Sequence, residues 1–241
     1  MSHPTLFFTV EHGDNKVPPE YEHLFAGQES VLASHRGHDP GAGELAVRFS
    51  TRFHAPYEHA EVSRLLIDQN RSLHNSRSLF SEYTRQLPKD VKQQIVDVYY
   101  WPYQYLVKRK IETLLVNSET VLHLSIHSFT PELNGKVRNC DVGLMYDPKR
   151  LAEKGFCVRW QEVITGCDPR IRVRRNYPYR GVCDGIVPSM RRQFPASRYI
   201  GLQIEINQKF PFGDREPWKH LQKTIVESFS RILEESQEWQ V

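Results

Sequence analysis

The sequence predicts an α/β fold in which a mostly parallel sheet lies between helices. Short apolar runs of strand length alternate along the chain with longer segments of helical periodicity, which is the order that parallel sheets require. Several of these runs end abruptly in charged or amide residues, as strands do at the ligand-binding edge of an α/β sheet. The 241 residues contain no internal repeat or linker, so we expect one domain over residues 1–241.

The first half of the chain begins with a predicted strand at 5–10 (TLFFTV), which is uniformly apolar and stops at charged residues. A polar, Gly-rich loop at 35–43 fits no regular element. From Glu44 to Phe53 the apolar residues recur at helical spacing, which favours a short amphipathic helix. The apolar run 60–67 (AEVSRLLI) is the second predicted strand.

The second half continues the alternation, with helices identified by apolar stripes and strands by compact apolar runs. A proline inside a helical pattern removes a backbone donor and bends or breaks the helix. In order, the predicted elements are a helix over 88–117 interrupted at Pro102, a strand over 119–126, a short apolar stretch at 142–145, a helix running into strand over 151–165, a basic loop over 170–198, a strand over 199–206 and a helix over 217–233.

The composition excludes several classes of protein. The net charge of +3 is too small to indicate a nucleic-acid partner, and no apolar run of about 18 residues indicates a membrane span. The four cysteines lack Cys-x-x-Cys spacing, which excludes a zinc site made only of cysteine. The N-terminal residues lack the pattern of an export signal, so we expect a cytoplasmic protein with free thiols.

Histidines follow or end two of the predicted strands, His12 after the first and His127 after the third. Two imidazoles and one carboxylate at the same sheet edge would form a metal site with an open position, as in catalytic zinc centres. Asp39, in the Gly-rich loop, is our choice for the carboxylate. The other candidates are Glu44, Asp14 and Glu11.

A carboxylate also interrupts the last predicted strand, where Glu205 lies within YIGLQIEI. Such a residue either points to solvent or is buried with a partner, and burial would raise its pKa into the range of a general base. The basic loop contains Arg174, Arg175 and Arg180 together with Tyr177 and Tyr179, which indicates a lid that binds an acidic substrate. The alternative is that this loop is simply a solvated basic face.

Seven segments carry a family resemblance, namely EHGDNKVP (11–18), HRGHDPGA (35–42), SRLLIDQNRS (63–72), LSIHSFTPELNG (124–135), VGLMYDPKR (142–150), RRNYPYRG (174–181) and IEINQ (204–208). In this order they resemble the N-formylglutamate amidohydrolase family. The resemblance implies a fold like that of the zinc-dependent exopeptidases and hydrolysis of an amide in a small acidic N-acyl amino acid.

The resemblance also implies roles for individual residues. His12 and His127 would be ligands of zinc or another divalent metal, and Glu205 the general base. Asn70 and Arg71 would hold the substrate carboxylate or its polarised carbonyl. The usual His-x-x-Glu spacing of zinc carboxypeptidases is missing because Asn15 stands three residues after His12, so Asp39 remains our third ligand.

Two other functions remain open at this stage. One is an amidase acting on a different N-acyl substrate, for example of peptidoglycan type. The other is a non-catalytic binding protein on the same fold, in which the basic loop and the aromatic segment 99–103 would contact a partner.

Overall fold

One mixed sheet forms the centre of the fold in the computed structural model, which describes residues 3–75 and 77–235. Its strand order is β2-β1-β3-β8-β6-β7 within that part of the chain. The strands are β1 (Thr5–Val10), β2 (Tyr57–His59), β3 (Val121–Phe129), β6 (Val142–Met145), β7 (Val173–Arg175) and β8 (Tyr199–Asn207). β2, β1, β3 and β8 run parallel to one another. The sheet is mixed because β6 pairs antiparallel with β8. The predicted α/β fold with a mostly parallel sheet between helices is confirmed.

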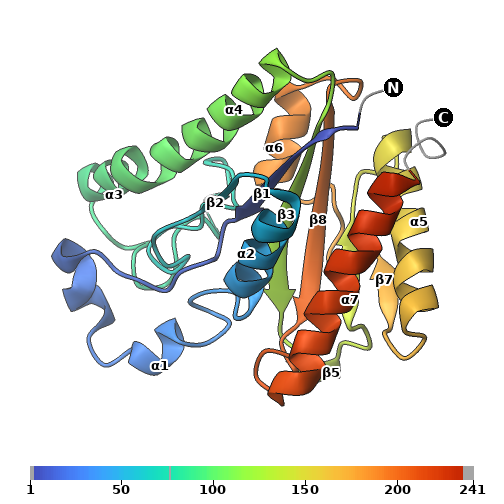
Figure 1. The fold of residues 1–241 in the computed structure, drawn as a ribbon. Coiled ribbons are helices and arrows are strands. Elements are labelled where there is room, and N and C mark those ends of the chain that lie inside the picture. Colours follow the sequence, from blue (N-terminus) through green and yellow to red (C-terminus); the bar gives the residue numbers. More distant parts are fainter. Residues whose placement is uncertain (1–2, 76, 236–241) are drawn as a thin grey trace.

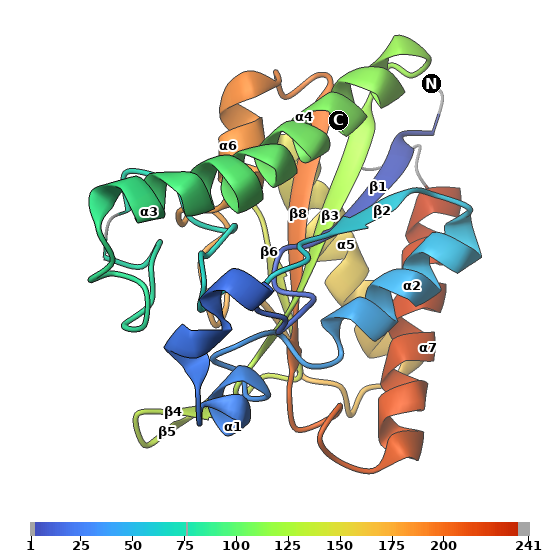
Figure 2. The same cartoon turned by 90° about the vertical axis from the view of Figure 1, so that its left-hand side faces the viewer.

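Helices cover both faces of this sheet (Figures 1 and 2). α2, α5 and α7 pack on one face, and α4 and α6 pack on the other. The helices are η1 (Pro19–Phe25), α1 (Glu29–Leu32), α2 (Ala42–Phe53), α3 (Lys89–Ile95), η2 (Val96–Tyr100), α4 (Trp101–Val116), α5 (Leu151–Cys167), α6 (Ile186–Gln193) and α7 (Arg215–Glu234). A separate hairpin consists of β4 (Glu132–Leu133) and β5 (Lys136–Val137), which pair antiparallel. No helix of the described residues is long and apolar enough to cross a bilayer.

The two faces of the sheet differ in character along the strands. On the side of α2, α5 and α7, the strand positions are apolar over most of their length, as for Leu124 of β3 and Ile204 of β8, and the polar Ser128 follows only near the end of β3. On the side of α4 and α6, the strands begin apolar and become polar towards their carboxyl ends, as in the series His123, Ser125 and His127 of β3. Because strand side chains alternate, this second face brings a polar layer to one edge of the sheet.

The predicted strand at 60–67 is wrong. The strand that pairs with β1 is β2, three residues earlier, and residues 62–72 fold as turns. Leu65, Leu66 and Ile67 are buried, but they pack in a cluster with residues of η1, α3 and η2. Ser63 stabilises the turn, since its Oγ accepts the N–H of Leu65 and donates to a distant backbone carbonyl. A buried apolar run therefore indicates burial here, not a strand.

Four further details differ from the predictions. The segment 151–165 does not run into a strand, because α5 continues unbroken to Cys167. The basic segment 170–198 is not all loop and contains β7 and α6. The helix expected from Glu44 begins at Ala42, and the interruption expected near Pro102 is the π-helical turn η2 that precedes α4. The four cysteines are free, as predicted.

A close backbone approach joins β6 to the loop that follows β7. A Cβ atom at Gly143 would overlap the carbonyl oxygen of Tyr177, so only glycine fits between them. This contact holds the segment that carries Tyr179 and Arg180 against the sheet, at the level where Gly143 pairs with Glu205.

We expect Gly143→Ala to lower the free energy of unfolding by about 1–3 kcal/mol, because the added methyl must displace backbone. Gly166→Ala is the matched control. Its Cβ would meet nothing within 4 Å, and alanine favours a helix interior by up to about 1 kcal/mol. Urea unfolding curves of the two variants and the parent chain measure this, and equal midpoints for Gly143→Ala and the parent would contradict the close approach.

Candidate active site

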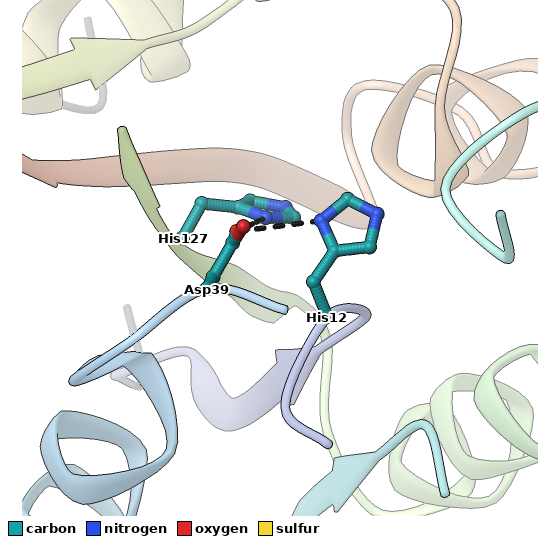
Figure 3. Close-up of side chains that lie close together, drawn as sticks. All are labelled: His12, Asp39 and His127. Carbon is teal, nitrogen blue, oxygen red and sulfur yellow. Dashed lines mark hydrogen bonds and ion pairs between the residues drawn. The ribbon is translucent and has the colours of Figure 1, made fainter. Parts of the chain in front are cut away.

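Three side chains from separate parts of the chain converge at the carboxyl edge of the sheet (Figure 3). His12 follows β1, Asp39 lies in the loop before α2, and His127 is near the end of β3. The Oδ2 atom of Asp39 lies 3.3 Å from Nδ1 of His12 and 2.9 Å from Nδ1 of His127. One potential ligand atom from each residue lies within 4.8 Å of the others, and all three side chains are buried.

Strand pairing and one tight turn explain this convergence. β1 and β3 are parallel neighbours, so the residues at their carboxyl ends share an edge. The Asp39 N–H donates to the His12 carbonyl at 2.8 Å, which ties the loop to the end of β1. Gly41 then adopts φ of 81° at the start of α2, where a side chain would strike Pro211.

Each imidazole is also held from its far side by a carboxylate. Nε2 of His12 lies 2.7 Å from Oδ1 of Asp68, and Nε2 of His127 lies 3.0 Å from Oε2 of Glu11. Tyr103 donates its hydroxyl to Glu11 at 3.0 Å. This arrangement directs both Nδ1 atoms at Asp39, and it is the way proteins orient metal-ligating histidines.

The electrostatics favour positive charge between these groups. Burial opposes ionisation of Glu11, but hydrogen bonding and the charge of His127 dominate and lower the pKa of Glu11 to about 2. Burial likewise works against the imidazolium of His127, yet hydrogen bonds and charges from Asp39 and Glu11 raise the pKa of His127 to about 10. Two imidazoles and a carboxylate in such a setting suit a zinc-like divalent cation.

The other candidate carboxylates lie elsewhere. Glu11 stands behind His127, on the side away from Asp39. Glu44 accepts a hydrogen bond from the indole of Trp218 on α7, and Asp14 pairs with the exposed Lys16. Among these four, the structure groups only Asp39 with the two histidines.

Glu205 faces the same site from β8. It pairs in register with His127, and its side chain lies on the polar face of the sheet. It is 6% exposed, and its Oε2 atom has no hydrogen-bond partner. Burial raises the pKa of Glu205 to about 8; the charge of His127 opposes this rise and that of Asp39 adds to it. The carboxylate predicted inside the strand is thus buried and aimed into a cavity of about 470 Å³.

Asn70, Arg71 and Arg180 also line this cavity, and they differ in how far their side chains are already hydrogen-bonded. The Asn70 side chain accepts the N–H of Ile186 at 2.8 Å, and its Nδ2 lies 3.3 Å from Nε2 of His127. Arg71 donates to two backbone carbonyls, that of Asn70 at 2.8 Å and that of Asp184 at 3.3 Å. The guanidinium of Arg180 has no partner among the described residues.

The basic loop contributes to the cavity through its second part. Tyr179 lines the cavity beside Arg180, whereas Arg174 and Arg175 belong to β7 and are exposed. The Arg174 guanidinium stacks over the ring of Tyr177 at 3.9 Å. Of these three arginines, Arg180 lines the cavity, and the substrate-binding lid expected of this loop stays a prediction.

Arg64 and Asp68 are site residues that the sequence alone did not identify. Arg64 lies 3.0 Å from Asp68 and 3.4 Å from Asp39, so it bridges the carboxylates on both sides of His12. Both residues belong to the segment 60–68 that was interpreted as a strand with a polar end. The sequence did contain a signal against a strand here. An arginine and an aspartate four residues apart lie too far from each other to pair in an extended strand, but they meet in a turn.

The chain is similar to known proteins over most of its length. The family model for N-formylglutamate amidohydrolase matches residues 5–210. The gene product Atu2144 from Agrobacterium tumefaciens has a TM-score of 0.78 at 24% identity, covering 95% of this chain and 92% of that one. N-formylglutamate amidohydrolase from Ralstonia eutropha JMP134 has a TM-score of 0.74 at 20% identity, covering 98% and 95%. No curated protein sequence matches.

The two structural likenesses show that the fold is shared over almost the whole length of each chain. The family match extends over most of the sequence and includes the five cavity residues His12, Asp39, Asn70, His127 and Glu205. The chain therefore belongs to the N-formylglutamate amidohydrolase family, whose members hydrolyse amide bonds.

Proposed function

We propose that this protein is a metal-dependent amidohydrolase that removes the acyl group from a small acidic N-acyl amino acid such as N-formylglutamate. One observation carries the proposal. The His12, Asp39 and His127 cluster and the unpartnered carboxylate of Glu205 face one cavity of about 470 Å³. A metal site and a general base together are what metal-assisted amide hydrolysis uses.

His12, Asp39 and His127 would hold the cation, with zinc the expected ion. A divalent ion there would polarise the amide carbonyl and lower the pKa of a water molecule beside it. Asp68 and Glu11 keep the rings in the tautomer that directs Nδ1 at the site.

Glu205 would act as the general base and then as the acid. Its carboxylate takes a proton from the water that attacks the carbonyl carbon. It returns this proton to the amide nitrogen as the C–N bond breaks, which releases the acid and the free amino group. A buried carboxylate whose pKa is raised towards neutrality suits both directions of transfer.

Substrate binding would fall to Asn70, Arg71 and Arg180. The Asn70 amide lies beside His127, so it is close to where the scissile group reacts. Arg71 is partly engaged by backbone carbonyls, whereas Arg180 is free to pair with a carboxylate in two parallel hydrogen bonds.

We expect His12→Ala and His127→Ala each to lose bound zinc, because each removes a ligand nitrogen. This loss should exceed the roughly 10- to 100-fold drop in metal affinity that follows when a residue hydrogen-bonded to a metal ligand is replaced. Elemental analysis after dialysis against limiting zinc measures this, with His23→Ala, an exposed histidine of η1, as the matched control. Full zinc content in either site variant would remove that residue from the ligand set.

Glu205→Gln should keep its zinc but lower kcat on N-formylglutamate by about 100- to 10,000-fold, the range for loss of a general base. Glu227→Gln, an exposed change on α7, is the control and should match the parent enzyme. Formate release and zinc content are measured on the same preparations. Retained turnover in Glu205→Gln would refute its assignment as the base.

A further inference from the structure

An unassigned amide side chain lies beside the proposed base. Gln203 precedes Glu205 by two residues on β8, so both point from the same face of the strand, and both line the same cavity. Gln203 is 9% exposed. Its amide makes no hydrogen bond with any residue that the structure describes.

The amide of Gln203 is held in a largely buried side chain and borders the cavity, where it is available to a ligand. Buried polar side chains in native proteins nearly always have a partner, and a polar side chain that borders a cavity without one is a candidate for binding. Gln203 pairs in register with Met145 of β6, which supplies no strong donor or acceptor, and with Ser125 of β3. The Ser125 hydroxyl is engaged by Glu11 and His127, so neither neighbour bonds the Gln203 amide, and a ligand in the cavity could.

Arg180, whose guanidinium has no partner among the described residues, lines the same cavity as Gln203. Gly181, next to Arg180, packs so closely on Tyr146 that a Cβ there would overlap its backbone. The side chain of Asn176 accepts the N–H groups of both Tyr146 and Gly181, at 3.2 and 2.9 Å. Arg180 is therefore held beside the end of β6, one residue from the position that faces Gln203.

Asp184 also lines the cavity, and its Oδ2 atom accepts the N–H of Ser72 and the side-chain amide of Asn75, each at 3.0 Å. Its carboxylate makes no hydrogen bond or ion pair with Gln203 or Arg180, so both remain available to a ligand.

We propose that Gln203 and Arg180 form the subsite for the side-chain carboxylate of the substrate. Two residues along a strand place Gln203 about 7 Å from Glu205, farther than the α-carboxylate lies from the reacting amide. The side chain of a glutamyl substrate extends in that direction, with the Gln203 amide donating to one oxygen and Arg180 pairing with the carboxylate. This inference rests on the proposed function, because it takes Glu205 to mark the reacting end.

The test compares three substrates that differ only at the side-chain end: N-formyl-L-glutamate, N-formyl-L-glutamine and N-formyl-L-norvaline. Gln203→Met keeps the side-chain length and removes the amide. We expect it to lower kcat/KM for N-formylglutamate about 10- to 100-fold, mainly through KM, and to change N-formylnorvaline less than about threefold. Gln203→Glu should reverse the preference, favouring N-formylglutamine over N-formylglutamate. Gln94→Met, exposed on α3, is the control.

A structural role for Gln203 predicts a different result, because a general disturbance would lower activity on all three substrates equally. Unchanged preference for N-formylglutamate in both Gln203 variants would overturn the subsite and leave the proposed function intact.

Calorimetric binding of L-glutamate and L-norvaline to the zinc-loaded enzyme separates the two proposals. In one outcome, the parent chain hydrolyses none of the substrates but binds L-glutamate more tightly than L-norvaline, and Gln203→Met loses this difference in affinity. The hydrolase function then fails and the subsite stands. Equal binding of both amino acids by a parent chain without activity would overturn both.

Discussion

The register between β3 and β8 is the constraint on which the site depends. It pairs His127 with Glu205, so a candidate metal ligand and the proposed base lie side by side on neighbouring strands. A slip of one residue would turn these groups into the apolar layer under α5 and α7, and would bring Leu124 and Ile204 to the cavity side. Burial of that apolar layer therefore favours the strand register in which His127 and Glu205 lie side by side.

The sequence was most informative where local rules decide the outcome. His12 and His127 were predicted because parallel strands deliver their carboxyl ends to one edge, and Glu205 because a carboxylate is anomalous in an apolar strand. Asn70 and Arg71 were placed after a strand that does not exist, since periodicity cannot distinguish a buried turn from a buried strand. They reach the cavity nonetheless, through turns that pack against η1, α3 and η2.

Long-range contacts account for what the sequence could not show. Arg64 bridges Asp39 and Asp68, and nothing local signals a contact with a residue 25 positions away. The alternation of His123, Ser125 and His127 in β3 did contain a signal, since polar residues at every second position mark one polar face. Gln203 followed the same pattern in β8 and would have been found by the same rule.

The helix formed by η2 and α4 contacts both halves of the cavity. Tyr103 donates to Glu11, which supports the imidazole of His127, while Gln104 donates to the carbonyl of Gln69 and Tyr100 to that of Arg71. The candidate metal site, through Glu11, and the turns with Asn70 are thus hydrogen-bonded to the same helix. A substitution that displaces this helix would therefore alter both halves of the cavity at once.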